Sequence, residues 1–153
     1  IINTKIYANL DIIISSGGNS ITSLENNSAN KFRKRLDDFY FQYVLRNNSS
    51  YLGICHGAQY LAKFYKSKIR KKENHVRVNH LVKIYSGGNK IVNSYHNFAV
   101  IKLGRNLKKI ASASDGTFEA FRHSKKKLLG IMWHPERYKK IKKIDLNLIK
   151  KHL

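Results

Sequence analysis

The sequence is poor in cysteine, in acidic residues and in long apolar runs. It holds one cysteine among 153 residues, which excludes an internal disulfide and is typical of proteins kept in a reducing cytoplasm. It has no run of about 18 apolar residues, so no transmembrane helix is expected. The first residues, Ile1 to Lys5, lack the apolar core and cleavage site of a signal peptide. We therefore expect a cytoplasmic protein that does not bind a membrane.

The scarcity of acidic residues leaves a large positive charge. The chain has thirty Lys and Arg residues and nine Asp and Glu residues, which gives a formal net charge of +21. Such a charge suits nucleic acid or another anionic partner. However, the lysines are scattered in short clusters, and no helix-turn-helix, zinc-finger or RNA-recognition motif accompanies them. A composition bias towards Lys, Asn and Ile explains the charge better, so we expect no nucleic-acid partner. A basic rim that attracts a small anionic substrate remains an alternative.

Length and patterning predict a single α/β domain over residues 1–153, with 42% hydrophobic residues. The first part alternates strand and helix, which favours a parallel sheet; the strands are expected at 10–15 and 51–54 and the helices at 30–47 and 57–65. Short strands separated by turn residues follow at 81–85, 90–95, 98–103, 110–114, 117–122 and 128–133. A basic helix over 139–153 is expected to face inward with Ile141, Ile144, Leu148 and Ile149.

The segment Gly53-Ile54-Cys55-His56-Gly57 is the cysteine form of a nucleophile elbow, G-x-C-x-G. A strand must turn abruptly into a helix at the nucleophile, and glycines two residues before and after it relieve the crowding. The turn aims the first N–H groups of the helix at the reacting atom. We therefore expect Cys55 to be a nucleophile that alkylates well below the reference thiol pKa of about 8.5.

A second motif, His134-Pro135-Glu136, directly follows the last predicted strand. A thiol needs a base to become a good nucleophile, and histidine is the usual one. A carboxylate that binds the other ring nitrogen fixes the tautomer and stabilises the charged ring. The two motifs together predict a Cys55–His134–Glu136 triad.

These motifs belong to a set of five that occur in one order along the chain. The set resembles the class I glutamine amidotransferase superfamily, in its γ-glutamyl hydrolase-like branch (peptidase family C26), from about residue 10 to residue 137. This resemblance implies a three-layer flavodoxin-like α/β fold, with a mostly parallel central sheet and a short antiparallel β region. The segments are Ser16-Gly17-Gly18-Asn19, Gly53-Ile54-Cys55-His56-Gly57-Ala58-Gln59, Val92-Asn93-Ser94-Tyr95-His96-Asn97, Asp115-Gly116-Thr117-Phe118-Glu119-Ala120 and Gly130-Ile131-Met132-Trp133-His134-Pro135-Glu136-Arg137.

The resemblance also implies a mechanism without a cofactor. Cys55 attacks the γ-carbonyl of a glutamine-like group, and His134, oriented by Glu136, takes the thiol proton and later gives it to the leaving amine. A γ-glutamyl thioester forms and water releases glutamate. The backbone N–H groups of Gly18 and His56 are expected to form the oxyanion hole.

Four further residues match family positions near the substrate. Gln59 is expected to contact its glutamyl part, and His96, Asn97 and Glu119 to lie close by. For His96 and Asn97 the alternative is a pair of polar residues at a strand end, and for Glu119 it is a structural role. His75 and His80 are interpreted as loop residues, and no metal site is expected, because no cysteine or carboxylate cluster accompanies them.

Within the superfamily, the amino-acid sequences of the motifs are most similar to those of hydrolases. Among these are enzymes that act on γ-glutamyl-CDP-amidate in capsule phosphoramidate synthesis. The expected partner is thus a small γ-glutamyl compound, with a nucleotide-linked one as an option. Two alternatives stay open. One is a glutaminase subunit that passes ammonia to a synthase partner, and the other is an inactive chain that serves as a binding module.

Two features depart from the family pattern. About one and a half β/α units that normally precede the strand at 10–15 are missing, so we expect a truncated chain with an exposed sheet edge and low stability. In the helix at 30–47, Arg35, Asp37 and Asp38 match an Arg-Asp motif only approximately. Tyr40 stands where a Glu is expected, so no role is assigned to that helix.

Overall fold

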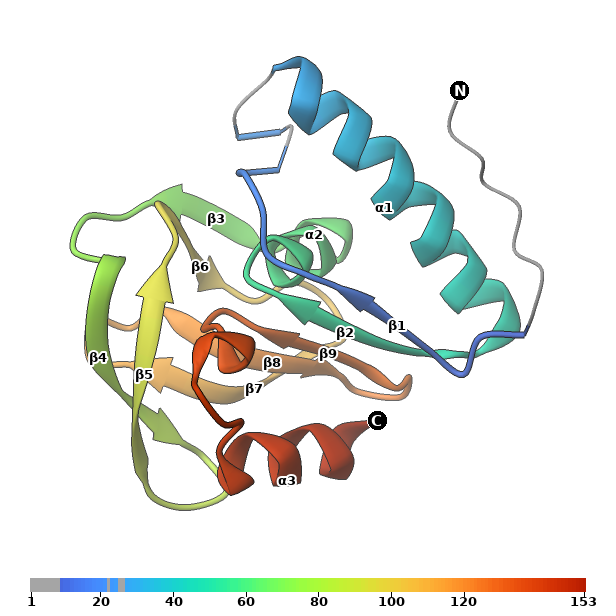
Figure 1. The fold of residues 1–153 in the computed structure, drawn as a ribbon. Coiled ribbons are helices and arrows are strands. Elements are labelled where there is room, and N and C mark those ends of the chain that lie inside the picture. The colour runs from blue at the N-terminus through green and yellow to red at the C-terminus, as the bar shows by residue number, and fades with distance from the viewer. Residues whose placement is uncertain (1–8, 22, 25–26) are drawn as a thin grey trace.

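The computed structural model describes residues 9–21, 23–24 and 27–153 as a curled mixed sheet covered by helices (Figure 1). This agrees with the α/β fold class expected from the sequence. The elements, in chain order, are β1 (Ile12–Ser15), α1 (Ser28–Asn47), β2 (Ser50–Ile54), α2 (His56–Phe64), β3 (Lys68–Lys71), β4 (Val76–Ile84), β5 (Asn89–Tyr95), β6 (Phe98–Lys102), β7 (Leu107–Ala113), β8 (Phe118–His123), β9 (Leu128–Ile131), a 3-10 turn at Pro135–Arg137 and α3 (Lys143–His152).

The parallel part of the sheet consists of β1, β2 and β9. The order continues antiparallel through β8, β7, β4 and β5, while β6 pairs with both β8 and β3. The antiparallel region is therefore larger than the short one expected. The short turns at Gly87-Gly88 and Asp115-Gly116 explain this, because a turn of that length joins only antiparallel strands.

The sheet separates two hydrophobic cores. On the side of α1 and α2 (Figure 1), Phe41 and Leu61 are fully buried against the strands. On the side of α3, Leu148 packs on a cluster that includes Trp133. Inward positions for Ile141 and Ile144 were wrongly predicted: their side chains are 42% and 41% exposed, because α3 begins only at Lys143 and turns Leu148 and Ile149 to the core.

A buried carboxylate fastens α3 to the sheet. Asp145 is fully buried and accepts a hydrogen bond from Trp133 Nε1 at 3.0 Å. It also forms an ion pair with Lys90 of β5, whose ammonium lies 4.9 Å from the centre of the Trp133 ring. These contacts fix Trp133, which directly precedes His134.

Two local predictions need correction. The strand β3 was missed, because its sequence Lys-Ile-Arg-Lys shows no alternation of apolar and polar residues and its side chains are largely exposed. His80 lies within β4 and not in a loop, since β4 begins five residues earlier than the predicted strand. Across the described part of the chain, no helix is both long and apolar enough to cross a membrane.

Gly57 offers a test of how closely β1 and α2 pack. A Cβ atom at this position would lie 2.2 Å from the Ser15 carbonyl oxygen, which is backbone and has little room to move. We expect Gly57→Ala to lower the free energy of unfolding by about 1–3 kcal/mol, as overpacked cores do. Urea titration would measure this loss. Gly87→Ala is the contrasting variant: its Cβ would meet nothing within 4 Å, so only its positive φ opposes it. An equal or smaller loss for Gly57→Ala would contradict the packing described.

Candidate active site

Cys55 stands at the turn between β2 and α2, at the carboxyl end of the parallel strands. Its φ of 49° lies in the left-handed region, which is costly for a residue with a Cβ and is found where a site fixes the backbone. A Cβ at Gly53 would lie 2.5 Å from the carbonyl carbon of Gly57. Glycine is therefore required at position 53 as well as at position 57, because the abrupt turn from strand to helix leaves no room for a Cβ.

Cys55 opens into a cavity of about 240 Å³. Five residues named from the sequence line it, namely Gly18, Cys55, Gln59, His96 and Asn97. The cavity is also lined by Asn19, Ser20 and Tyr95, which carried no predicted role. The structure thus brings together residues from the glycine loop, the elbow helix and the end of β5.

His134 and Glu136 form the expected pair at the end of β9. His134 Nδ1 lies 2.5 Å from Glu136 Oε1, while the buried Nε2 has no hydrogen-bond partner within the described residues. Burial alone would raise the pKa of Glu136, but the hydrogen bond from His134, a backbone hydrogen bond and the charge of Arg137 together outweigh it, and the pKa is lowered. Glu136 is therefore an ionised acceptor that leaves Nε2 of the ring free for a proton.

Two neighbours, Asn93 and Gly17, hold His134 in place. Their contacts with His134 were not predicted from the sequence. Asn93 Oδ1 accepts a hydrogen bond from the His134 N–H at 2.8 Å, and Asn93 Nδ2 donates to the His134 carbonyl at 3.0 Å. The ring packs against Gly17, where a Cβ would lie 2.6 Å from His134 Cε1. Gly17 is thus needed for close approach, and it brings His134 beside Gly18 of the cavity.

His56 links the elbow helix to the glycine loop. Its Nδ1 contacts the carbonyl oxygen of Asn19, and its Nε2 lies 2.7 Å from Asp37 Oδ2. The ring is 2% exposed, so these contacts fix its orientation. Gly18 and His56 are the two residues expected to form the oxyanion hole. The buried His56 side chain connects them, because it contacts Asn19, the residue that follows Gly18.

Asp37 connects α1, to which the sequence assigned no role, with His56 of the elbow helix. Its carboxylate also accepts hydrogen bonds from Ser15 Oγ at 3.0 Å and from Arg33 Nε at 3.2 Å. Burial would raise the pKa of Asp37, but the His56, Arg33 and Ser15 contacts together lower it. The approximate Arg-Asp motif obscured this residue. Its position on the inward side of α1 was the available signal.

The remaining predicted residues fall into different surroundings. Gln59 Nε2 donates to the Phe98 carbonyl at 3.0 Å, whereas its buried Oε1 is unpaired among the described residues. Asn97 is exposed at the rim. Glu119 is fully buried behind His96, whose Nε2 lies 3.6 Å from Glu119 Oε1. Burial opposes ionisation there, but His80 and His96 lower the pKa of Glu119 to about 2.

The ionisation of Cys55 differs from the expectation of a resting thiolate. The thiol is 5% exposed, and burial raises its pKa to about 12, although a hydrogen bond from the His56 N–H opposes the shift. Glu119 and Glu136 add to the rise. Cys55 is thus a neutral thiol near pH 7.

This ionisation predicts the pH dependence of alkylation. Because the pKa of Cys55 is raised to about 12, we expect iodoacetamide to react slowly at pH 7 and ever faster up to pH 10, without a plateau near the reference value of about 8.5. Mass spectrometry of the labelled chain measures the rate. Since Cys55 is the one cysteine, Cys55→Ser gives the background. A plateau below pH 8 would contradict this prediction.

Asp37 predicts a contribution to stability that depends on pH. Its folded-state pKa is lowered, so the unfolded chain takes up the proton first as the pH falls. The stabilisation is present above the unfolded pKa of about 3.9 and is lost as the pH falls through the folded value. We expect Asp37→Asn to be less stable than the parent at pH 7 and to lose less stability between pH 5 and pH 3.

Urea titrations across that pH range measure the effect. Asp38→Asn is the matched control on the same helix, because the Asp38 side chain is 44% exposed. If Asp37→Asn and the parent lose stability in parallel on acidification, the lowered pKa is not the cause.

Comparison with known proteins supplies the family relationships. The sequence model of the family "Glutamine amidotransferase class-I" matches residues 3–149. A γ-glutamyl-CDP-amidate hydrolase of Campylobacter jejuni is 37% identical over 134 residues, which are 88% of this chain and 66% of that protein. A glutamine-hydrolysing GMP synthase subunit of Archaeoglobus fulgidus is 33% identical over 95 residues, 57% of this chain and 52% of that protein.

Solved structures agree on the fold. A glutamine amidotransferase of Thermotoga maritima superposes with a TM-score of 0.70 at 19% identity, covering 86% of this chain and 60% of that one. A putative GMP synthase subunit of Thermoplasma acidophilum gives a TM-score of 0.67 at 22% identity, covering 83% of this chain and 64% of that one. The chain therefore spans between 52% and 66% of the length of these relatives.

Proposed function

Because this chain belongs to the class I glutamine amidotransferase family, we propose that it hydrolyses a γ-glutamyl amide through a thioester on Cys55. The observation that carries the proposal is the contact of the buried His134 with Glu136, 2.5 Å between Nδ1 and Oε1, beside the glycine loop that lines the Cys55 cavity. Cys55, His134 and Glu136 are the residues proposed to perform the reaction.

In the proposed reaction, His134 Nε2 accepts the Cys55 proton as the sulfur attacks the γ-carbonyl carbon. The tetrahedral intermediate collapses, the C–N bond breaks, and the amine leaves with the proton that His134 returns. Water then gives a proton to His134 and attacks the thioester, which releases glutamate and restores the thiol. Glu136 stabilises the charged ring in both halves.

The oxyanion is proposed to bind to the backbone N–H groups of Gly18 and His56. The His56 N–H is directed at the Cys55 sulfur, and Gly18 faces the same cavity. One such donor contributes about 3 kcal/mol to the transition state. Asp37 and Asn19 hold His56, so we assign them a positioning role.

Gln59 is proposed to bind the glutamyl part of the substrate, with His96 and Asn97 close by. The unpaired Oε1 of Gln59 suits an α-ammonium donor, because its Nε2 is already bound to Phe98. Asn97 lies at the exposed rim, where the leaving amine would project. Glu119 is proposed to act on this site only through His96.

For the leaving group we propose a phosphorylated nucleotide, as in γ-glutamyl-CDP-amidate. Two observations support it: the hydrolase of Campylobacter jejuni that is 37% identical, and a net charge of +21, which favours an anionic substrate. A second candidate is a glutaminase subunit that supplies ammonia to a synthase, which the relationship to the GMP synthase subunit of Archaeoglobus fulgidus favours.

Product analysis separates these functions. We expect glutamate release from γ-glutamyl-CDP-amidate or another γ-glutamyl amide without any partner, and little ammonia from free glutamine. Glu136→Gln should reduce the rate by about 10²–10⁴-fold, the usual contribution of an oriented acid–base group. Cys55→Ala should abolish it.

Glu73→Gln, the same change at an exposed position, should leave the rate unchanged. Turnover of glutamine only when a synthase is added would favour the second candidate. Glutamate release that survives Cys55→Ala would overturn the thioester mechanism.

A further inference from the structure

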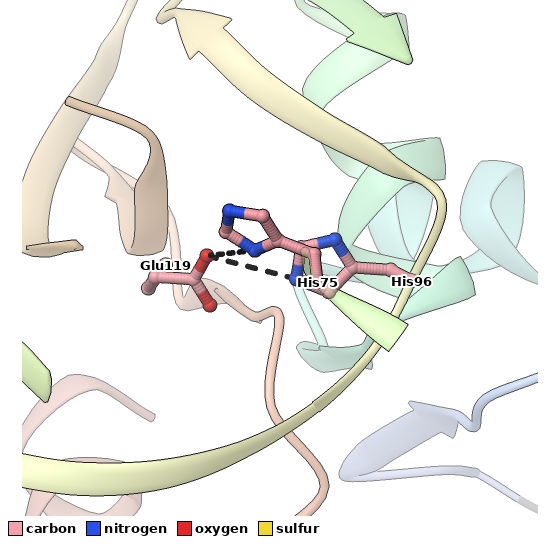
Figure 2. Close-up of side chains that lie close together, drawn as sticks. All are labelled: His75, His96 and Glu119. Atoms are coloured by element: carbon pink, nitrogen blue, oxygen red, sulfur yellow. Dashed lines mark ion pairs between the residues drawn. The ribbon is translucent and has the colours of Figure 1, made fainter. Parts of the chain in front are cut away.

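A second cluster of ionisable side chains includes His96 and lies behind the wall of the Cys55 cavity that His96 lines. His75, His96 and Glu119 are all buried, and one nitrogen or oxygen from each lies within 4.8 Å of the others. Figure 2 shows both imidazole rings directed at the Glu119 carboxylate. The ring of His80, within β4, faces the Oε2 atom of the same carboxylate. The side chains converge from the start of β4, the end of β5 and the start of β8.

The distances in this cluster are too long for hydrogen bonds. His75 Nδ1 and His96 Nε2 lie 3.8 Å and 3.6 Å from Glu119 Oε1, and His80 Nε2 lies 3.5 Å from Oε2. Around a tetrahedral zinc ion with bonds of about 2.0–2.1 Å, neighbouring ligand atoms are about 3.3–3.4 Å apart. The spacing between each histidine and Glu119 is therefore close to that of ligands sharing one ion, within a set of three whose ligand atoms all lie within 4.8 Å of one another.

The same atoms are buried without partners. His75 Nδ1, His80 Nε2, both ring nitrogens of His96 and Glu119 Oε2 have no hydrogen bond within the described residues. Glu119 Oε1 has one long contact, 3.4 Å from Thr117 Oγ1. Because a buried polar atom without a partner is costly, so many in one place indicate a binding site for a ligand that interacts with all of them.

The outer contacts of His75 are those of a metal ligand. His75 Nε2 lies 3.0 Å from Asp115 Oδ2, so the ring donates its proton there and presents the lone pair of Nδ1 to Glu119. Histidines that bind metals commonly donate their other N–H to a carboxylate in this way. Asp115 is itself held by Thr117 and by Lys72, 3.3 Å away. A lone pair that faces a carboxylate is unfavourable unless a proton or a metal ion lies between them.

The backbone makes this arrangement rigid. The His75 carbonyl accepts hydrogen bonds from the His96 N–H at 3.1 Å and from Ser94 Oγ at 2.6 Å. The segment before β4 is thus fastened to the end of β5, and the two rings are held with their centres 4.9 Å apart. Little reorganisation would be needed for both histidines to bind one ion.

We propose that His75 Nδ1, His96 Nε2 and the Glu119 carboxylate bind a divalent zinc-type ion, with His80 Nε2 as the fourth ligand. Two or three histidines with one carboxylate form a ligand set suited to zinc. The ion joins β4, β5 and β8 behind the wall of the Cys55 cavity that His96 lines. The proposal departs from the expectation of no metal site: the carboxylate that the sequence did not place beside the histidines is Glu119, more than 20 residues from His96 in the chain.

Metal titration of the protein, freed of metal by a chelator, tests the proposal. We expect zinc chloride to bind with one equivalent and a dissociation constant of about 1 μM or lower. Cobalt chloride should give the visible bands of tetrahedral coordination without a sulfur charge-transfer band. Cys55→Ser should bind equally well, which separates this site from the catalytic thiol.

Variants locate the site. We expect Glu119→Gln to abolish saturable binding and Asp115→Asn, an outer-contact change, to weaken it about 10–100-fold. His152→Gln, a histidine on α3, should bind as the parent does. Circular dichroism checks that each variant is folded; should Glu119→Gln fail to fold, Asp115→Asn and the cobalt spectrum still decide.

The absence of saturable binding by the parent protein would overturn the proposal. Unchanged affinity in both the Glu119 and Asp115 variants, or loss of binding in Cys55→Ser, would do the same. In the first case the cluster has a structural role only.

Discussion

The backbone turn at Cys55 is the constraint on which the rest of the site depends. A residue with a side chain occupies a φ of 49° there, because β2 ends and α2 begins within one residue. Gly53 and Gly57 permit the close packing that holds this turn. The turn directs the sulfur into the cavity and the His56 N–H towards the sulfur. The strain is supported by β1 and β9, which flank β2 in parallel.

Burial at this turn has a chemical consequence. It raises the pKa of Cys55, so the thiol rests in its neutral form. The hydrogen bond from the His56 N–H lowers the pKa of Cys55, but the effect of burial is larger. In the mechanism we propose, reactivity depends on the position of His134, which contacts with Asn93, Glu136 and Gly17 determine.

Two buried carboxylates organise the histidines around the cavity in different ways. Asp37 makes short contacts with His56 and lies within a complete hydrogen-bond network. Glu119 faces three histidines at 3.5–3.8 Å and leaves several atoms unpaired. The first geometry is that of a finished positioning network, and the second is that of ligands around an ion. His96 connects the second to the wall of the cavity.

The sequence alone determined the fold class, the position of the elbow and the His-Pro-Glu motif, because each depends on local spacing. It also identified Gly18, Gln59, His96 and Asn97, which the structure brings to one cavity with Cys55. Only the tertiary structure decided the extent of the antiparallel region, the contact of Asp37 with His56, and the meeting of His75 with Glu119. These features join residues far apart in the chain, and the raised pKa of Cys55 depends on burial, which no local pattern records.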